Sequence, residues 1–187
     1  MSEPELTLAR CRADILEVAA CRAGAGELAR RARDAGCTLP PLGRAQPDAA
    51  ALALAVRPER WLLLLPAAAA GANAAAWQRR CAGAGTVVEL SAGLHAFALT
   101  GSAAREVLRR GCRLDLDPAV FPAGTAAATS IAQVAVTLAA LPAGLLLLTP
   151  GSTAGHFTEW LGGAARAFRM TRAGDATVAA MCGASNS

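Results

Sequence analysis

The sequence contains no lysine and no tyrosine, and it is poor in charged and aromatic residues. Charged residues make up 17% of the 187 positions and aromatic residues 4%, whereas hydrophobic residues make up 54%. An average soluble domain carries roughly 25% charged residues. Because a small monomer normally needs mixed surface charge for solubility, this composition favours burial of part of the surface against a partner.

The basic residues also give little support to nucleic-acid binding. All 18 are arginine, the formal net charge is +4, and the arginines are spread along the chain with only three adjacent doublets, Arg30-Arg31, Arg79-Arg80 and Arg109-Arg110. Nucleic-acid binding normally needs a basic face or aromatic residues on which bases stack. Scattered arginines suit pairing with the carboxylates of a neighbouring protein equally well.

Cysteine usage and hydropathy bear on the compartment. The six cysteines include no CxxC pair, which argues against a zinc site. The N-terminus carries charges throughout and has no apolar signal core, so we expect a cytoplasmic protein with reduced thiols. The long segment 118–158 has no Asp, Glu or Arg, but prolines and glycines divide it into strand-sized pieces, so no membrane span is predicted.

The first fifty residues predict a small N-terminal lobe. Leu6–Ala9 and Ile15–Val18 are apolar and compatible with strands around a turn, and Gly26–Asp34 predicts a short helix that ends at Gly36. The proline-rich segment 37–48 then predicts a loop. We expect a single domain over 1–187, built from an N-terminal lobe (1–50), a main lobe (51–171) and a flexible tail (172–187).

The next segment predicts strands and two helices. Ala51–Val56 and Trp61–Leu65 predict a hairpin, and 73–82 predicts a helix with Trp77 in the core. Val87–Leu90 and Leu94–Leu99 flank a small-residue turn and precede a second helix. For that helix we expect Ser102 as the N-cap and Gly111 at the C-terminal end.

The last third predicts two strands and a helix. Side chains alternate from Ser130 to Leu138, which indicates one strand, and Leu145–Thr149 indicates another. Ser152 is expected to cap a final helix with an apolar stripe formed by Phe157, Trp160, Leu161, Ala164 and Phe168. The element order predicts an α+β fold with antiparallel sheets, helices on one face and ferredoxin-like βαββαβ units.

Residues that could carry catalysis are few and isolated. Asp115 and Asp117 have no further oxygen ligands nearby in sequence, so a solvated loop is favoured over a cation site. His95 is interpreted as a structural histidine, and His156 has no nucleophile beside it. The sequence therefore predicts no catalytic, cofactor-binding or metal-binding residue.

One long segment resembles the gamma subunit of heterotetrameric sarcosine oxidase. It runs from Ala98 to Leu138, and the matching positions include Gly101, Ala104-Arg105, Leu108, Gly111-Cys112, Leu114-Asp115-Leu116, Pro118, Phe121-Pro122, Gly124 and Thr129. Upstream, Arg57-Pro58-Glu59-Arg60-Trp61-Leu62-Leu63 resembles the RPxRWLL segment of the family, and downstream Ser152, Ala154, Trp160-Leu161, Ala164-Ala165 and Phe168 resemble its last helix. Two positions depart from the family pattern, namely Ser102, where the family has proline, and Gly151, where it has arginine.

The resemblance implies a fold related to the folate-binding domain of the aminomethyltransferase of glycine cleavage. It also implies a complex that oxidises the N-methyl group of sarcosine or a related amine, releases hydrogen peroxide and passes a one-carbon unit to tetrahydrofolate. The alpha, beta and delta subunits are then the partners, and they are expected to carry FAD, FMN, NAD, tetrahydrofolate and zinc. The gamma subunit carries none of these groups and supports assembly.

Two alternatives remain from the sequence, a stand-alone folate-dependent one-carbon enzyme and a small-molecule binding module. The first would need an acid poised to take the folate proton, and in the folate-repair branch a Lys-Gly-Cys-Tyr signature that a chain without lysine and tyrosine lacks. For the gamma-subunit interpretation we predict partner contacts at Arg60, Trp61, Arg105 and Gln133, because binding hot spots are often Trp or Arg.

Overall fold

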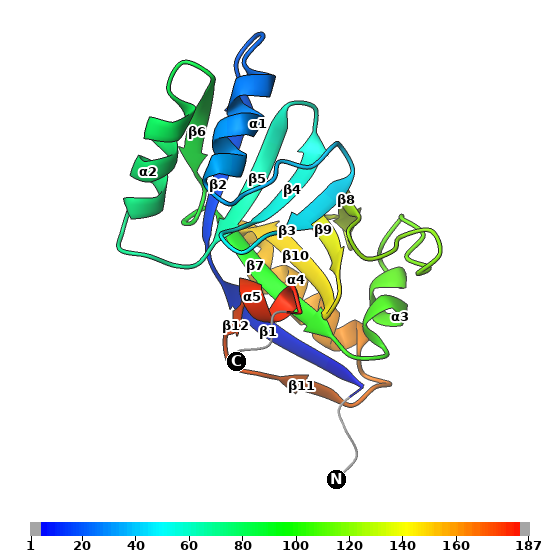
Figure 1. Ribbon diagram of the computed structural model, residues 1–187. Coiled ribbons are helices and arrows are strands. Elements are labelled where there is room, and N and C mark those ends of the chain that lie inside the picture. Colours follow the sequence, from blue (N-terminus) through cyan, green and yellow to red (C-terminus); the bar gives the residue numbers. More distant parts are fainter. Residues whose placement is uncertain (1–4, 184–187) are drawn as a thin grey trace.

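The computed structural model describes residues 5–183 and places two β-sheets face to face, each with helices on its outer side (Figure 1). One apolar cluster fills the space between the sheets, and two further clusters lie between each sheet and its helices. Both faces of each sheet are therefore buried, which explains long apolar runs such as Leu62–Leu65. The predicted α+β class with antiparallel sheets is confirmed.

The five-stranded sheet has the order β3-β4-β5-β2-β6, and every neighbouring pair is antiparallel. Its strands are β2 (Asp14–Ala20), β3 (Arg44–Pro47), β4 (Leu52–Arg57), β5 (Arg60–Leu65) and β6 (Gly85–Glu89). Helices α1 (Ala25–Asp34) and α2 (Ala72–Cys81) cover its outer face. Trp77 of α2 is buried in this layer, as predicted.

The seven-stranded sheet has the order β11-β1-β7-β10-β9-β8, and β12 also pairs with β1. Its strands are β1 (Leu6–Arg12), β7 (Leu94–Thr100), β8 (Ala126–Ile131), β9 (Val134–Leu141), β10 (Gly144–Pro150), β11 (Met170–Arg172) and β12 (Ala176–Thr177). Helices α3 (Ala104–Arg109) and α4 (Gly151–Ala164) pack on its outer face. The predicted stripe of α4 faces this layer, where Phe157 and Leu161 are fully buried.

The chain crosses between the sheets twice, which the sequence did not predict. β1 and β2 are separated only by Ala13, yet they belong to different sheets, and so do β6 and β7. Neither pair forms a hairpin, because each strand finds its partners far away in the sequence. The predicted lobe boundary at residue 50 falls inside the five-stranded sheet, where β3 pairs with β4. β3 itself lies in the segment 37–48, for which the prolines predict a loop, and it forms a strand because its residues pair with β4.

A hairpin turn corrects the single strand predicted over Ser130–Leu138. The chain turns at Ala132 and Gln133, whose φ angles are +49° and +66°, so β8 ends at Ile131 and β9 begins at Val134. Two-residue turns with positive φ usually carry Asn or Gly. Ala132 and Gln133 give no such signal, and the apolar alternation continues through them.

Three predicted helix ends and the predicted tail also differ from the structure. No side chain caps α3 or α4, so Ser102 and Ser152 are not N-caps. Gly111 is not left-handed; instead a Cβ there would lie 2.5 Å from a ring carbon of Trp160, so close packing explains the glycine. Within the predicted tail, β11 ends at Arg172, and β12 and α5 (Val178–Met181) follow, with Val178 and Met181 buried between the sheets. Residues 184–187 lie outside the described part.

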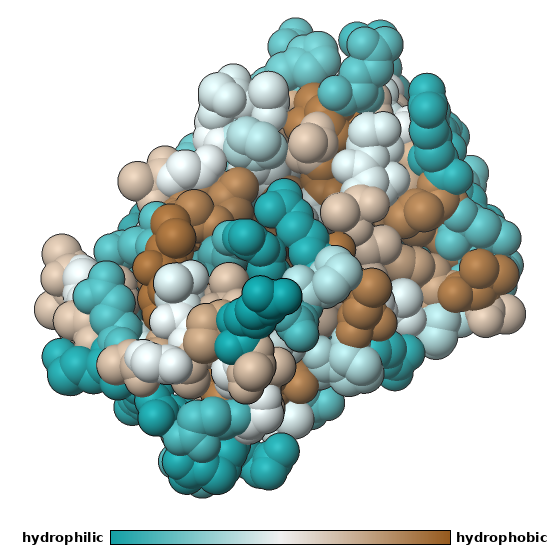
Figure 2. Space-filling model, turned by 90° about the horizontal axis from the view of Figure 1, so that it is seen from above, coloured by the Kyte–Doolittle hydropathy of each residue, from teal (hydrophilic) through white to brown (hydrophobic). Residues whose placement is uncertain are grey.

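The surface mixes polar and apolar residues. Figure 2 shows apolar patches between polar side chains on one face of the molecule. Across the described residues, the exposed large hydrophobic side chains are Leu42, Val88 and Val120. Single exposed apolar residues of this kind are common in soluble proteins. Among residues 5–183 no helix is long and apolar enough to cross a membrane.

Candidate functional site: a cleft between the two sheets

A cleft of about 390 Å³ opens where the two sheets diverge. The lining residues come from both sheets and from the β6–β7 connection: Glu17, Val56, Arg57, Arg60, Trp61, Leu62, Leu90, Leu94, Ala128, Thr129, Ala135, Val136, Thr137, Leu148 and Pro150. We call this the inter-sheet cleft. Its volume lies within the range of about 300–1,000 Å³ typical of ligand pockets.

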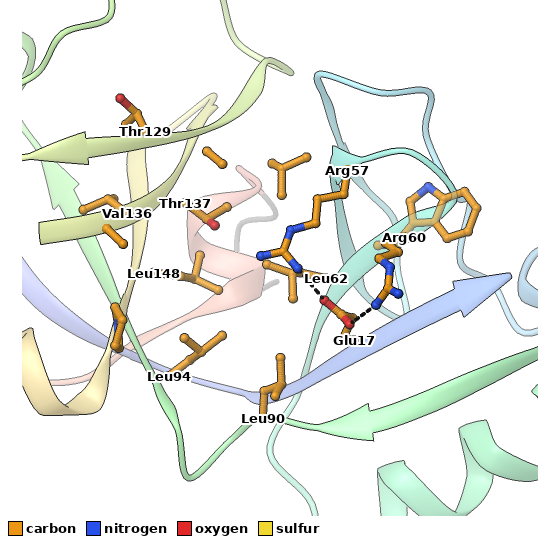
Figure 3. A pocket seen from close by; sticks show the side chains of 15 residues that line it. Glu17, Arg57, Arg60, Leu62, Leu90, Leu94, Thr129, Val136, Thr137 and Leu148 are labelled. Atoms are coloured by element: carbon orange, nitrogen blue, oxygen red, sulfur yellow. Dashed lines mark hydrogen bonds and ion pairs between the residues drawn. The ribbon is translucent and has the colours of Figure 1, made fainter.

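The bottom of the inter-sheet cleft is apolar. Leu62 of β5 and Leu148 of β10 are buried there, and they belong to the cluster that fills the space between the sheets. Leu90 and Leu94 are partly buried and pack against the same cluster. Figure 3 shows these four leucines beside the charged side chains of Glu17, Arg57 and Arg60. The cleft is thus an open continuation of the inter-sheet core.

The rim carries two arginines that share one carboxylate (Figure 3). Nη1 of Arg60 lies 2.9 Å from Oε1 of Glu17, and Nη1 of Arg57 lies 3.7 Å from Oε2 of the same residue. Glu17 is on β2 between the buried residues Leu16 and Val18, and its side chain is only 19% exposed. The two arginine side chains are 66% and 51% exposed, so both can still reach a partner or ligand.

Of the four predicted contact residues, the structure brings two to this cleft. Arg60 and Trp61 begin β5 and border it, but the indole of Trp61 packs on the helix side of the five-stranded sheet, where its Nε1 donates a hydrogen bond of 2.8 Å to the carbonyl oxygen of Pro40. Gln133 is exposed in the β8–β9 turn, and Arg105 is on α3. Neither of these two lines the cleft. Whether any of the four contacts a partner stays a prediction.

Sequence reasoning missed Glu17, Arg57 and the leucines of the cleft. A charged residue between two buried positions of a strand, as at Glu17, was the available signal. This signal could not have indicated Arg57 and Arg60, because their side chains meet Glu17 only after β2 and β5 pair.

Arg105 has a structural role in the chain itself. Its Nη1 donates to the carbonyl oxygens of Leu116 and Phe121, at 2.7 and 2.9 Å, and so holds the segment between α3 and β8. Burial and the nearby Arg109 lower the pKa of the Arg105 guanidinium from its ordinary value. A side chain held in this way is less available to a partner than Arg57 or Arg60.

We expect Arg105→Ala to lower the free energy of unfolding by about 2–3 kcal/mol, because two partly buried carbonyls lose a charged donor. The control is Arg109→Ala on the same helix, which removes only exposed ion pairs with Asp115 and Asp117. Exposed pairs contribute about 0–1 kcal/mol each. Urea denaturation of the purified chain measures both changes, and equal effects would contradict the structural role of Arg105.

The aspartates and histidines considered from the sequence do not assemble into a site. The side chain of Asp117 accepts from the backbone N–H of Ala119 and pairs with Arg109, and both contacts lower the pKa of its carboxyl. His95 packs edge-on against Phe97, whereas His156 is exposed. Within residues 5–183, no three His, Cys, Asp or Glu side chains are grouped as a metal site would require.

The buried cysteines are poor nucleophiles. Burial raises the pKa of the Cys37 thiol to about 12 and that of Cys11 to about 11, so both remain protonated at neutral pH. Nucleophilic and metal-binding cysteines act as thiolates. These two positions therefore serve packing.

Two arginine doublets that are separate in sequence meet on the helical side of the five-stranded sheet. Arg31 of α1 donates to the carbonyl oxygens of Arg80 and Ala82 at the end of α2. Glu27 pairs with Arg30 and Arg31, and these contacts lower the pKa of its carboxyl to about 2. The cluster thus joins the two helices and satisfies carbonyls at the C-terminus of α2.

Comparisons with known proteins agree with the family resemblance. Residues 44–166, more than half of the chain, match the sarcosine oxidase, gamma subunit family. The chain belongs to this family. Among curated proteins no significantly similar sequence was found.

Several solved structures are similar to this gamma-subunit family member, two of them as follows. One is a chain of heterotetrameric sarcosine oxidase from Corynebacterium sp. U-96, solved in complex with pyrrole 2-carboxylate. The identity is 26% and the TM-score 0.78, over 92% of this chain and 90% of that one. The other is the glycine cleavage system aminomethyltransferase T from Bartonella henselae, with 18% identity and a TM-score of 0.66 over 90% of this chain and 48% of that one. The second likeness supports the predicted relation to the aminomethyltransferase fold.

Proposed function

We propose that this chain is a non-catalytic subunit that supports the assembly of a heterotetrameric sarcosine oxidase-like complex. The complex oxidatively demethylates sarcosine or a related secondary amine with O₂, forms hydrogen peroxide and passes the one-carbon unit to tetrahydrofolate. Its alpha, beta and delta subunits carry FAD, FMN, NAD, tetrahydrofolate and zinc between them, and the complex is cytoplasmic.

The observation that carries the proposal is the likeness to a chain of a heterotetrameric sarcosine oxidase over nearly the whole length of both chains. The family match over residues 44–166 supports it independently. An exposed Arg60 at the inter-sheet cleft and a half-buried Trp61, whose indole packs on the helix side of the five-stranded sheet, are residue types that are frequent at the centres of interfaces.

Co-expression with candidate genes for the alpha, beta and delta subunits tests the proposal. A tagged copy of this chain is expected to bring down a flavin-containing complex, identified by its flavin absorbance and by mass spectrometry. A soluble monomer that recovers no flavoprotein would overturn the assembly role.

Trp61→Ala is expected to weaken this co-purification about tenfold or more, as substitution of an interface hot spot does. Because the indole of Trp61 also donates a hydrogen bond to the carbonyl oxygen of Pro40, near-UV circular dichroism must first show that the variant is folded. The control is Trp160→Phe, which changes a tryptophan on the face of the seven-stranded sheet that is turned away from the inter-sheet cleft. An unchanged yield with a folded Trp61→Ala subunit would remove Trp61 from the interface.

The likeness to an aminomethyltransferase favours one competing function, folate binding by this chain itself. Isothermal titration of the purified chain with tetrahydrofolate distinguishes folate binding by this chain from a purely assembly-related role. For a non-catalytic subunit we expect no heat of binding at micromolar concentrations. Micromolar affinity would favour the one-carbon enzyme.

A further inference from the structure

The outer edge of β8 has backbone groups without partners beside the inter-sheet cleft. β8 is the last strand of the seven-stranded sheet, and β9 pairs with its inner edge. On the outer edge, the N–H of Ala126 donates to Gly43 and the N–H of Ala132 donates to Gly111. These two contacts close the ends of the edge and leave its centre open.

The direction of these bonds fixes which groups are free. Backbone N–H and C=O groups point to the same side of a strand at every second residue. The N–H of Ala126 points outward, whereas the C=O of Thr125 points toward β9 and accepts from the N–H of Ala140. The backbone groups of Ala128 and Ser130 therefore also point outward. The bridge between Cys112 and Ile131 engages the C=O of Ser130 at one end of the edge, but within residues 5–183 no backbone hydrogen bond reaches the N–H or C=O of Ala128 or the N–H of Ser130. Such a row is a template for an added strand.

The same strand borders the inter-sheet cleft. Ala128 of β8 lines it, and the side chain of Ala128 is on the face directed at the five-stranded sheet, opposite Thr137 of β9. Side chains of an added strand would alternate between the two faces. Every second one would therefore point toward the five-stranded sheet, into or along the cleft.

Charge selects the kind of segment that fits. Among the described residues, Glu17 is the only acidic one that lines the cleft, and it faces both Arg57 and Arg60, so this lining carries one excess positive charge. Glu59, in the same turn as these arginines, does not line the cleft. An acidic side chain satisfies the remaining guanidinium N–H groups, and an apolar side chain covers Leu90 and Leu94.

We propose that an extended segment of a partner subunit adds to β8 at Ala128–Ser130 and places an apolar and an acidic side chain in the inter-sheet cleft. This inference rests on the assembly role proposed above. Two features favour a polypeptide over a small molecule: the free strand edge, which pairs with a backbone, and the exposed arginines of an open rim, which would leave a small ligand largely in solvent.

Two variants of the tagged chain test strand addition and charge recognition separately, in co-expression with the oxidase genes. Ala128→Pro removes the outward N–H of residue 128 and leaves the hydrogen bonds to β9 in place. Edge strands tolerate proline at such positions. The comparison variant Ala128→Val also adds bulk to the cleft but keeps the N–H, so a larger loss for Ala128→Pro isolates the contribution of strand pairing. Arg57→Gln/Arg60→Gln removes the rim charges, and its control, Arg22→Gln/Arg33→Gln, removes two exposed arginines that do not line the cleft.

We expect Ala128→Pro and Arg57→Gln/Arg60→Gln each to lower the yield of co-purified partner at least tenfold, Ala128→Val to lower it less than Ala128→Pro does, and Arg22→Gln/Arg33→Gln to leave it within twofold. Thermal melting of each purified chain checks folding. Wild-type yields for both test variants would overturn the inference, and a loss confined to the arginine variant would overturn strand addition. If the wild-type chain recovers no partner at all, the assembly role itself fails, which is a distinct result.

Discussion

Phe157→Ala is expected to lower the free energy of unfolding by about 3–5 kcal/mol, the range for truncating a buried phenylalanine. Phe157 is fully buried between α4 and the seven-stranded sheet. Its ring lies 6.2 Å from that of Phe97 and 6.1 Å from that of Trp160, measured between centroids. Alanine would leave a cavity at the centre of this layer, and packed strands cannot close in on it.

Urea denaturation followed by circular dichroism measures this change. The control is Val120→Ala, because Val120 is 61% exposed and its truncation should change stability by less than about 0.5 kcal/mol. A loss for Phe157→Ala close to that of the control would mean that α4 does not pack on the sheet as described. Phe157→Leu should fall between the two, since it refills part of the cavity.

Gly101→Ala is expected to cost about 3 kcal/mol or more, because strained backbone and overpacking each cost about 1–3 kcal/mol. The φ angle of Gly101 is +106°, a conformation that side chains with a Cβ rarely adopt. A Cβ there would also lie 2.4 Å from the carbonyl oxygen of Glu5. That oxygen accepts from the N–H of Ala103, so β1 cannot move away without losing a bond that positions α3.

Gly155→Ala on α4 is the matched control. A Cβ at Gly155 meets nothing within 4 Å, and the residue lies in a helix with an ordinary φ. Alanine there should stabilise the chain by about 0.5–1 kcal/mol, because it lowers the entropy of the unfolded state. Opposite signs for the two substitutions in one denaturation series are the expected outcome. A stabilising Gly101→Ala would contradict the described turn.

The proposed interface gives the low charge of the chain a physical explanation. Both sheets are covered on both faces within the chain, so the missing charge is not explained by one bare sheet face. Among residues 5–183, the apolar lining of the inter-sheet cleft lies next to backbone groups of β8 that have no backbone partner. A partner strand would cover the apolar lining and also pair with the free backbone groups of β8.

Local sequence patterns determined most individual elements. The apolar runs at Leu62–Leu65 and Leu145–Leu148 predicted strands, and the spacing of Phe157 and Leu161 predicted the inward face of α4, as the structure confirms. These features depend on periodicity within a few residues. The family resemblance likewise depended on local motifs, and it was confirmed.

Only the tertiary structure decided how the strands are shared between two sheets and where a cleft forms. A single residue, Ala13, separates strands of different sheets, and the turn at Ala132–Gln133 lacks the residues that usually indicate one. Glu17, Arg57 and Ala128 meet around the inter-sheet cleft although they lie far apart in the chain. Periodicity describes which face of a strand is apolar, but strand pairing depends on long-range contacts, so no local pattern could place these three residues together.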